Sequence, residues 1–306
     1  MKLSICSGNL QKAFGKDMFR VMKECGFDAC DLNVASVWGM TDGALRQYCE
    51  RVRALADEAG IVIGQTHAGY QYPRESGNDW KAVTEQAIDA IRATSYLGAP
   101  FCIVHPARFP GRYNHRLVEE NYRATVENYK KLIPYLEEYQ VVCCLENMWD
   151  RDPYFDRICG TILSRADELV RMCDELNAIA PGRFGICVDT GHCELTQDPA
   201  AEMLRLCGSR LKALHCHDTD GISDLHTLPF SIHGAPAGCE PMRTDWEEIM
   251  GILREIGYEG TLNFEVYVPD PAPIVPAGLR YLGKIGQYLL DVYENGTDVA
   301  EKEVKA

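Results

Sequence analysis

The stretch Phe184-Gly185-Ile186-Cys187-Val188-Asp189-Thr190-Gly191-His192 joins a short apolar run to a group of polar residues. A run of this length, followed by polar residues and glycine, is typical of a buried β-strand. Seven further runs of the same kind lie along the chain, at Leu3–Cys6, Ala29–Leu32, Val62–Thr66, Phe101–Val104, Val141–Leu145, Leu211–Leu214 and Thr261–Phe264. The sequence therefore predicts eight strands.

Amphipathic helical patterns separate these strands from one end of the chain to the other. They lie at Lys16–Cys25, Thr41–Ala59, Trp80–Tyr96, Asn114–Tyr139, Arg165–Leu176, Ala200–Leu206, Thr244–Ile256 and Ala277–Tyr293. Thr244 and Glu247 have the spacing of a capping box, and Gly60 follows a helix as a C-cap does. Strict alternation without a linker predicts one (β/α)₈ TIM barrel over residues 1–293 and a charged tail over 294–306. A doubly wound open sheet is the alternative.

The composition excludes several classes of protein. Among 306 residues, Lys and Arg number 31 and Asp and Glu number 45, so the formal net charge is −14. A field of this sign repels phosphate backbones and anionic lipids, which argues against nucleic acid as a partner. No apolar stretch approaches the roughly 18 residues of a membrane span, and the N-terminus does not resemble a signal peptide. We expect a cytoplasmic protein whose 14 scattered cysteines are reduced.

Histidines and carboxylates follow six of the predicted strands, and barrel enzymes carry their chemistry at that end of the strands. These residues are His67, His105, Glu146, Asp189 with His192, His215 with His217, and Glu265, and the loop after the seventh strand adds Asp224 and His226. Any one of them alone is more often a capped or solvated side chain than a ligand. Buried together at one barrel mouth, they would repel one another or stay unsatisfied unless a cation neutralised them. The sequence therefore predicts a divalent metal.

Four of these residues form an oxygen-rich ligand set from four successive strands: Glu146, Asp189, His215 and Glu265. Three carboxylates and one imidazole suit Mn²⁺, Mg²⁺, Co²⁺ or Zn²⁺, and we favour Mn²⁺. If His215 points into the barrel, the alternation of side chains along a strand brings His217 back to the same side. His217 could then be a ligand, a partner of a ligand or a substrate contact.

The same motifs resemble the xylose isomerase-like barrel superfamily, which includes sugar phosphate isomerases and epimerases, ketose 3-epimerases, inosose isomerases and endonuclease IV. Leu145-Glu146-Asn147, Val188-Asp189-Thr190-Gly191-His192 and His215-Cys216-His217-Asp218-Thr219-Asp220-Gly221 occur in the family's order. The resemblance implies one catalytic metal on the four residues named above, a substrate contact at His192 and a homo-oligomer. His67, His105, His192, Asp224 and His226 match positions where endonuclease IV binds further zinc ions, so extra metals or sugar hydroxyls are alternative partners for them.

The predicted chemistry is metal-assisted proton transfer on a sugar, a sugar phosphate or a related polyol or keto-sugar. A metal would stabilise an enediolate while Glu146 and Glu265 remove and return a proton on opposite faces. His192 and His217 would position the carbohydrate, the only partner we expect besides a second copy of the chain. We favour an isomerase or epimerase. The alternatives are a lyase or hydratase acting on a keto-glycoside, an endonuclease IV-like phosphodiesterase and a non-catalytic sugar-binding subunit.

Overall fold

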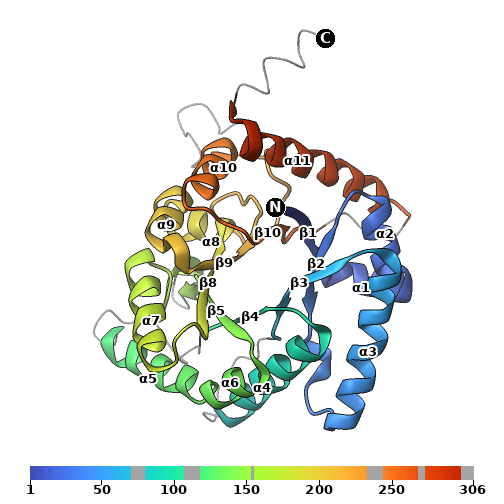
Figure 1. Cartoon of the computed structure of the whole chain (residues 1–306). Coiled ribbons are helices and arrows are strands. Elements are labelled where there is room, and N and C mark those ends of the chain that lie inside the picture. Colours follow the sequence, from blue (N-terminus) through green and yellow to red (C-terminus); the bar gives the residue numbers. More distant parts are fainter. Residues whose placement is uncertain (70–79, 107–117, 153–154, 233–243, 268–272, 298–306) are drawn as a thin grey trace, which may run out of the picture.

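The computed structural model of the chain describes residues 1–69, 80–106, 118–152, 155–232, 244–267 and 273–297. Eight parallel strands form one sheet in the order β10-β1-β2-β3-β4-β5-β8-β9, and helices surround it (Figure 1). The strands are β1 (Lys2–Cys6), β2 (Ala29–Asn33), β3 (Val62–His67), β4 (Phe101–Val104), β5 (Val142–Glu146), β8 (Phe184–Asp189), β9 (Leu211–His215) and β10 (Thr261–Phe264). The predicted (β/α)₈ barrel is confirmed, and the open sheet is excluded.

The barrel closes between β9 and β10 just beyond the end of β9. Cys216 forms a parallel bridge with Phe264, because its N–H donates to the Asn263 carbonyl and its carbonyl accepts from the Glu265 N–H at 3.2 Å. Along the sheet, Glu146 pairs with Cys187, and Asp189 pairs with His215. The carboxyl ends of these strands therefore lie at nearly the same level, which brings their last residues together.

The helices that surround the barrel are α1 (Gly8–Phe14), α2 (Met18–Glu24), α3 (Asp42–Ala59), α4 (Trp80–Leu97), α5 (Val118–Lys130), α6 (Ile133–Tyr139), α7 (Ala166–Ile179), α8 (Thr190–Thr196), α9 (Ala200–Cys207), α10 (Trp246–Glu255) and α11 (Val275–Asn295). The last helix, α11, packs next to the first strand (Figure 1). Gly286 permits this approach, since a Cβ atom there would lie 2.4 Å from Leu3 Cδ1.

Each strand prediction agrees with the structure to within one residue at each end, whereas three helix predictions need correction. Residues before Cys25 form two helices, α1 and α2, joined by a 3₁₀ turn. The helix predicted over 114–139 is divided into α5 and α6 because Pro134 occupies the first turn of α6, where proline is tolerated. Its residues 114–117 lie outside the described ranges. The capping box at Thr244 is wrong, because Asp245 is the N-cap and accepts from the Glu248 N–H.

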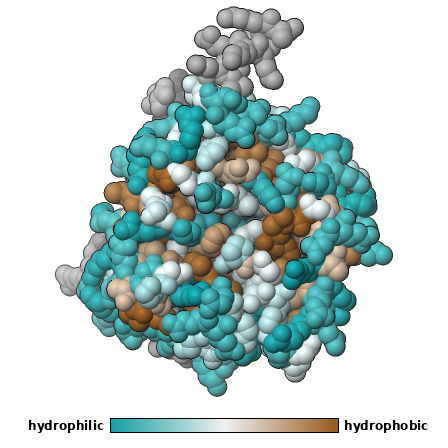
Figure 2. Space-filling model, in the orientation of Figure 1, coloured by the Kyte–Doolittle hydropathy of each residue, from teal (hydrophilic) through white to brown (hydrophobic). Residues whose placement is uncertain are grey.

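The core lies mainly between the strands and the helices, and a small cluster of Ile103, Cys144, Cys187 and Ala213 fills the barrel interior. The described cysteines are free, and most are buried. Hydrophilic residues cover most of the face seen in Figure 2, with hydrophobic residues between them near its middle. Among the described helices, none is both long and apolar enough to cross a membrane. The predicted tail remains untested, because α11 continues to Asn295 and residues 298–306 lie outside the described ranges.

Candidate active site

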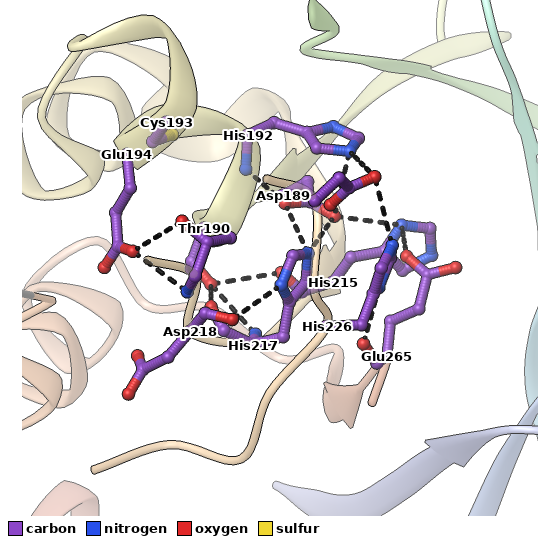
Figure 3. A network of polar contacts seen from close by, with 12 residues as sticks. Asp189, Thr190, His192, Cys193, Glu194, His215, His217, Asp218, His226 and Glu265 are labelled. Carbon is purple, nitrogen blue, oxygen red and sulfur yellow. Dashed lines mark hydrogen bonds and ion pairs between the residues drawn. The ribbon is translucent and has the colours of Figure 1, made fainter. Parts of the chain in front are cut away.

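His215 lies at the centre of the candidate site, at the end of β9, and has no exposed surface. Its Nδ1 atom lies 2.7 Å from Glu146 Oε1 and 3.0 Å from Glu265 Oε2. Asp189 Oδ2 is 3.9 Å from the same nitrogen. Figure 3 shows Asp189, His215 and Glu265 converging from three different elements. The structure therefore places the three predicted carboxylate ligands around one nitrogen atom of the fourth, His215.

A second group, formed by His67 on β3 and His105 after β4, extends this centre through Glu146. The Nε2 atoms of the two histidines lie 3.0 Å apart. His105 Nε2 is 2.8 Å from Glu146 Oε2, and His67 Nε2 is 3.6 Å from the same oxygen. Glu146 thus has one carboxylate oxygen directed at His215 and the other directed at the histidine pair.

A third group combines His192 of α8 with Asp224 and His226 of the loop that follows β9. Asp224 Oδ2 lies 3.2 Å from His226 Nε2 and 3.8 Å from His192 Nε2. It also accepts a hydrogen bond from Trp149 Nε1 at 3.2 Å. Since His192 Nε2 is 3.9 Å from Asp189 Oδ2, this group adjoins the centre. The nine residues of these three groups, all predicted to lie at the barrel mouth, therefore form one continuous cluster.

The imidazoles of this cluster are oriented by acceptors elsewhere in the protein. His192 Nδ1 lies 2.8 Å from the Asn147 carbonyl, and His226 Nδ1 lies 2.8 Å from the Glu265 carbonyl. A carbonyl can only accept, so both Nδ1 atoms carry a proton and both Nε2 atoms face Asp224. One nitrogen bound to the protein and the other directed inward is the arrangement of a metal-binding or substrate-binding histidine.

The side chain of His217 is packed between the start of α8 and His226. Its buried ring stacks on His226 with the ring centroids 4.1 Å apart, and its Nε2 lies 3.1 Å from Asp189 Oδ1. A Cβ atom on Gly191 would lie 2.0 Å from His217 Cε1, so this contact requires glycine at the start of α8. Figure 3 shows His217 between the start of α8 and His226.

Electrostatics around Asp189 and Asp224 favour positive charge. Burial alone would lower the pKa of His192, but the charges of Asp189 and Asp224 raise it to about 10. Burial likewise opposes protonation of His226, yet its hydrogen bond with Asp224 raises that pKa to about 9. These carboxylates therefore stabilise a cation in their midst, and a bound metal ion supplies such a charge in place of protons.

The donor set fits a divalent metal. Ligand atoms of several groups of three lie within 4.8 Å of one another, among them His67, His215 and Glu265, and Asp189, His192 and His217. Within the described part of the chain, the buried atom Asp224 Oδ1 accepts no hydrogen bond, and Glu146 Oε2 faces only the two histidines. Buried carboxylate oxygens that accept no hydrogen bond need another source of positive charge. A cation at the mouth would meet that need.

Sequence reasoning missed two residues that hold this site. Asn147 donates to the Asp189 carbonyl and accepts from the Asp189 N–H, at 2.9 and 2.7 Å. Asp31 of β2 lies 2.9 Å from His215 Nε2 and is completely buried. The sequence could have identified Asp31, because its carboxylate lies within a predicted apolar strand. A charge buried in such a strand requires a partner.

Comparisons with known proteins agree with this architecture. The family model described as "Xylose isomerase-like TIM barrel" matches residues 19–285. The uncharacterized protein y4fM of Sinorhizobium fredii is 37% identical over 197 residues, 62% of this chain and 55% of that protein. The match thus spans about half the length of this curated relative.

Two solved structures share the fold over nearly the whole chain. A D-tagatose 3-epimerase-like protein superposes with a TM-score of 0.72 at 20% identity, covering 96% of this chain and 98% of the other. The 3-keto-D-glucoside 4-epimerase YcjR of E. coli, in its apo form, gives a TM-score of 0.64 at 18% identity over 93% and 99% of the two chains.

Proposed function

Because this chain belongs to the xylose isomerase-like TIM barrel family, we propose that it is a metal-dependent isomerase or epimerase of a small carbohydrate. The observation that supports this proposal is the meeting of Glu146, Asp189 and Glu265 at His215 Nδ1. The names of the two structural neighbours add support, since both describe epimerases of sugars or sugar derivatives. The substrate could be a free sugar, a sugar phosphate or a keto-sugar.

The four residues of the centre would hold the metal, and Mn²⁺ is our first choice for this oxygen-rich set. When bound, the metal would act as a Lewis acid toward a carbonyl or hydroxyl oxygen of the sugar. Glu146 and Glu265 come from β5 and from the end of β10, and both approach the same nitrogen of His215. We assign to this pair the removal and return of the substrate proton on opposite faces of the sugar.

Exposure distinguishes the two carboxylates of the pair. The Glu265 side chain is 21% exposed, whereas the Glu146 side chain is 1% exposed. Glu265 is therefore the more accessible of the two to an entering sugar. We assign His192 and His217 to positioning the substrate.

We further propose that His67, His105, His192, Asp224 and His226 bind either additional metal ions or the hydroxyl groups of the substrate. The contacts of Glu146 and Asp224 on both sides of the centre support this proposal.

If extra metals bind, an endonuclease IV-like phosphodiesterase becomes the second candidate, although a net charge of −14 opposes docking on DNA. Elimination or hydration of a keto-glycoside could use the same carboxylate pair. The setting we propose is a cytoplasmic enzyme that forms a homo-oligomer.

The decisive experiment is a substrate screen with defined metal content. Purified protein is stripped with a chelator, reloaded with Mn²⁺ and incubated with ketoses, keto-glycosides and inososes, and the products are identified by NMR. We expect interconversion of isomers or epimers that requires the metal and is lost in Glu146→Gln. Metal-dependent cleavage of a DNA duplex with an abasic site, with no sugar converted, would overturn the proposal in favour of the phosphodiesterase.

A further inference from the structure

Asp31 supports His215 from inside the barrel. Its Oδ2 atom lies 2.9 Å from His215 Nε2, and neither residue has any exposed surface. Asp31 is in the interior of β2, whereas barrel interiors are usually filled by branched apolar side chains. A carboxylate buried at such a position is costly unless it has a specific role.

The contact fixes which nitrogen of His215 faces the carboxylates. An ionised carboxylate can only accept, so His215 Nε2 must be the donor toward Asp31. In a neutral imidazole the other nitrogen then has a free lone pair. That nitrogen, Nδ1, is the atom that lies next to Glu146 and Glu265. The contact with Asp31 therefore favours the His215 tautomer that is protonated at Nε2, in which Nδ1 can bind a cation.

The orientation of Asp31 is itself fixed by a chain of buried amides. Gln65 Nε2 donates to Asp31 Oδ2 at 2.9 Å and also contacts the Leu214 carbonyl at 3.3 Å. Asn263 Nδ2 lies 3.4 Å from the same oxygen, and Ser4 donates to Asn263 at 2.8 Å. The register between β2 and β3 shifts between Cys30 and Asp31, and a shift of this kind redirects the side chains next to it. Four strands thus cooperate to hold one carboxylate against His215.

We propose that Asp31 is a positioning residue, which fixes the ring and the tautomer of His215 and strengthens Nδ1 as a metal ligand. Carboxylates that accept from the second nitrogen of a ligating histidine act in this way. The inference rests on the proposed function, because it requires a metal at His215. It goes beyond that function in assigning a role to a residue that touches neither the metal nor the substrate.

The test measures metal affinity on the full-length protein. Metal-free wild type and Asp31→Asn are titrated with Co²⁺, and the dissociation constant and the visible spectrum of the bound ion are recorded. We expect affinity to fall about 10- to 100-fold in Asp31→Asn, together with a changed Co²⁺ spectrum. Thr125→Val is the matched control, since it removes a buried hydrogen bond, from Thr125 Oγ1 to the Asn121 carbonyl at 2.8 Å in α5, that involves neither Asp31 nor the residues that orient it. It should leave the Co²⁺ affinity and spectrum unchanged.

A second variant covers the event that Asp31→Asn fails to fold. Gln65→Met removes the donor that orients Asp31 but keeps its charge, and we expect it to weaken Co²⁺ binding severalfold. Affinity within twofold of wild type in the folded variants, with an unchanged spectrum, would overturn the role of Asp31 and leave the proposed function intact. Wild type that binds no metal at all would overturn both.

Discussion

His215 Nδ1 lies 2.7 Å from Glu146 Oε1, although the two residues are 69 positions apart in the chain. Both side chains are buried, and the sheet order β5-β8-β9 brings the ends of their strands to one mouth. The same ring meets Glu265 at 3.0 Å and, through its other nitrogen, Asp31 at 2.9 Å. An imidazole surrounded by three carboxylates is stable there as a cation or as the ligand of one. We therefore expect metal content to be the property most sensitive to changes at this contact.

We expect Glu146→Gln and Asp189→Asn each to reduce bound metal by more than about tenfold, because each removes a ligand charge from the centre. Elemental analysis of dialysed protein measures the occupancy and shows how many metals wild type binds. Glu202→Gln, at an exposed position of α9, should keep the metal content of wild type. Equal metal in wild type and in both ligand variants would refute the four-ligand assignment.

Restored metal should also stabilise the wild-type protein. A ligand that binds only the folded state at a hundred times its dissociation constant adds about 2.7 kcal/mol to the free energy of unfolding. We expect a higher Tm after Mn²⁺ is returned to stripped wild type, and a much smaller rise in Glu146→Gln at the same concentration. Equal rises in the two proteins would place the bound metal elsewhere.

Gly191→Ala should damage the site through a single added carbon atom. The new Cβ would lie 2.0 Å from His217 Cε1, so the histidine ring must move away from Asp189 and His226. Overpacking of this kind costs about 1–3 kcal/mol, and a displacement of about 1 Å at an active site can cost 10²-fold in rate. Urea denaturation and kcat/KM measure the two effects.

Gly251→Ala is the matched control for this change. Gly251 lies in α10, and no atom lies within 4 Å of the Cβ that alanine would add. We expect stability to rise by up to about 1 kcal/mol, because alanine has the higher helix propensity, and kcat/KM to stay the same. Similar behaviour of the two alanine variants would show that His217 is not held against α8.

Asp218 is expected to make the protein less stable as the pH rises from about 4 to about 7. Burial and the nearby Glu194 raise the pKa of Asp218 to about 7, although Trp246 donates to its Oδ1 at 2.8 Å. The folded state then binds a proton that the unfolded state has already lost, so the free energy of unfolding falls across this pH range. Asp218→Asn should become more stable relative to wild type as the pH rises. Denaturation curves at several pH values measure this difference, and Glu255→Gln, an exposed change in α10, should track wild type.

The strands and the nine residues at the mouth were predictable because both depend on local pattern. An apolar run specifies a strand, and parallel strands place their carboxyl ends at one level, so residues such as Glu146 and Asp189 must meet. Asp31 was not predictable in this way, because the shift in register beside it depends on how β2 pairs with β3.

The hairpin of β6 (Trp149–Asp152) and β7 (Arg157–Gly160) escaped prediction for a different reason. Its strands pair antiparallel, and their sequences, Trp-Asp-Arg-Asp and Arg-Ile-Cys-Gly, are short and lack the apolar alternation that marks a strand. The hairpin nevertheless carries Trp149 to Asp224. Contacts made between loops of a barrel depend on tertiary packing, which periodicity does not encode.

The proposed proton transfer gives the last prediction. If Glu146 and Glu265 act on opposite faces of a sugar, turnover of the true substrate in D₂O should introduce deuterium at the carbon next to the carbonyl. Replacing the glutamate that abstracts the proton by glutamine should suppress this exchange, because an amide cannot accept the proton. Both residues approach His215 Nδ1, so either change could also release metal.

Metal content must therefore be measured on the same samples, and only a variant that keeps its metal and loses exchange identifies the base. NMR of the product measures the deuterium. Glu202→Gln, treated in the same way, is the control variant in which the centre is intact. Full turnover without deuterium in the product, or undiminished exchange in both metal-bound variants, would exclude proton transfer through this pair. The reaction would then require a hydride shift or a base outside the nine residues of the mouth.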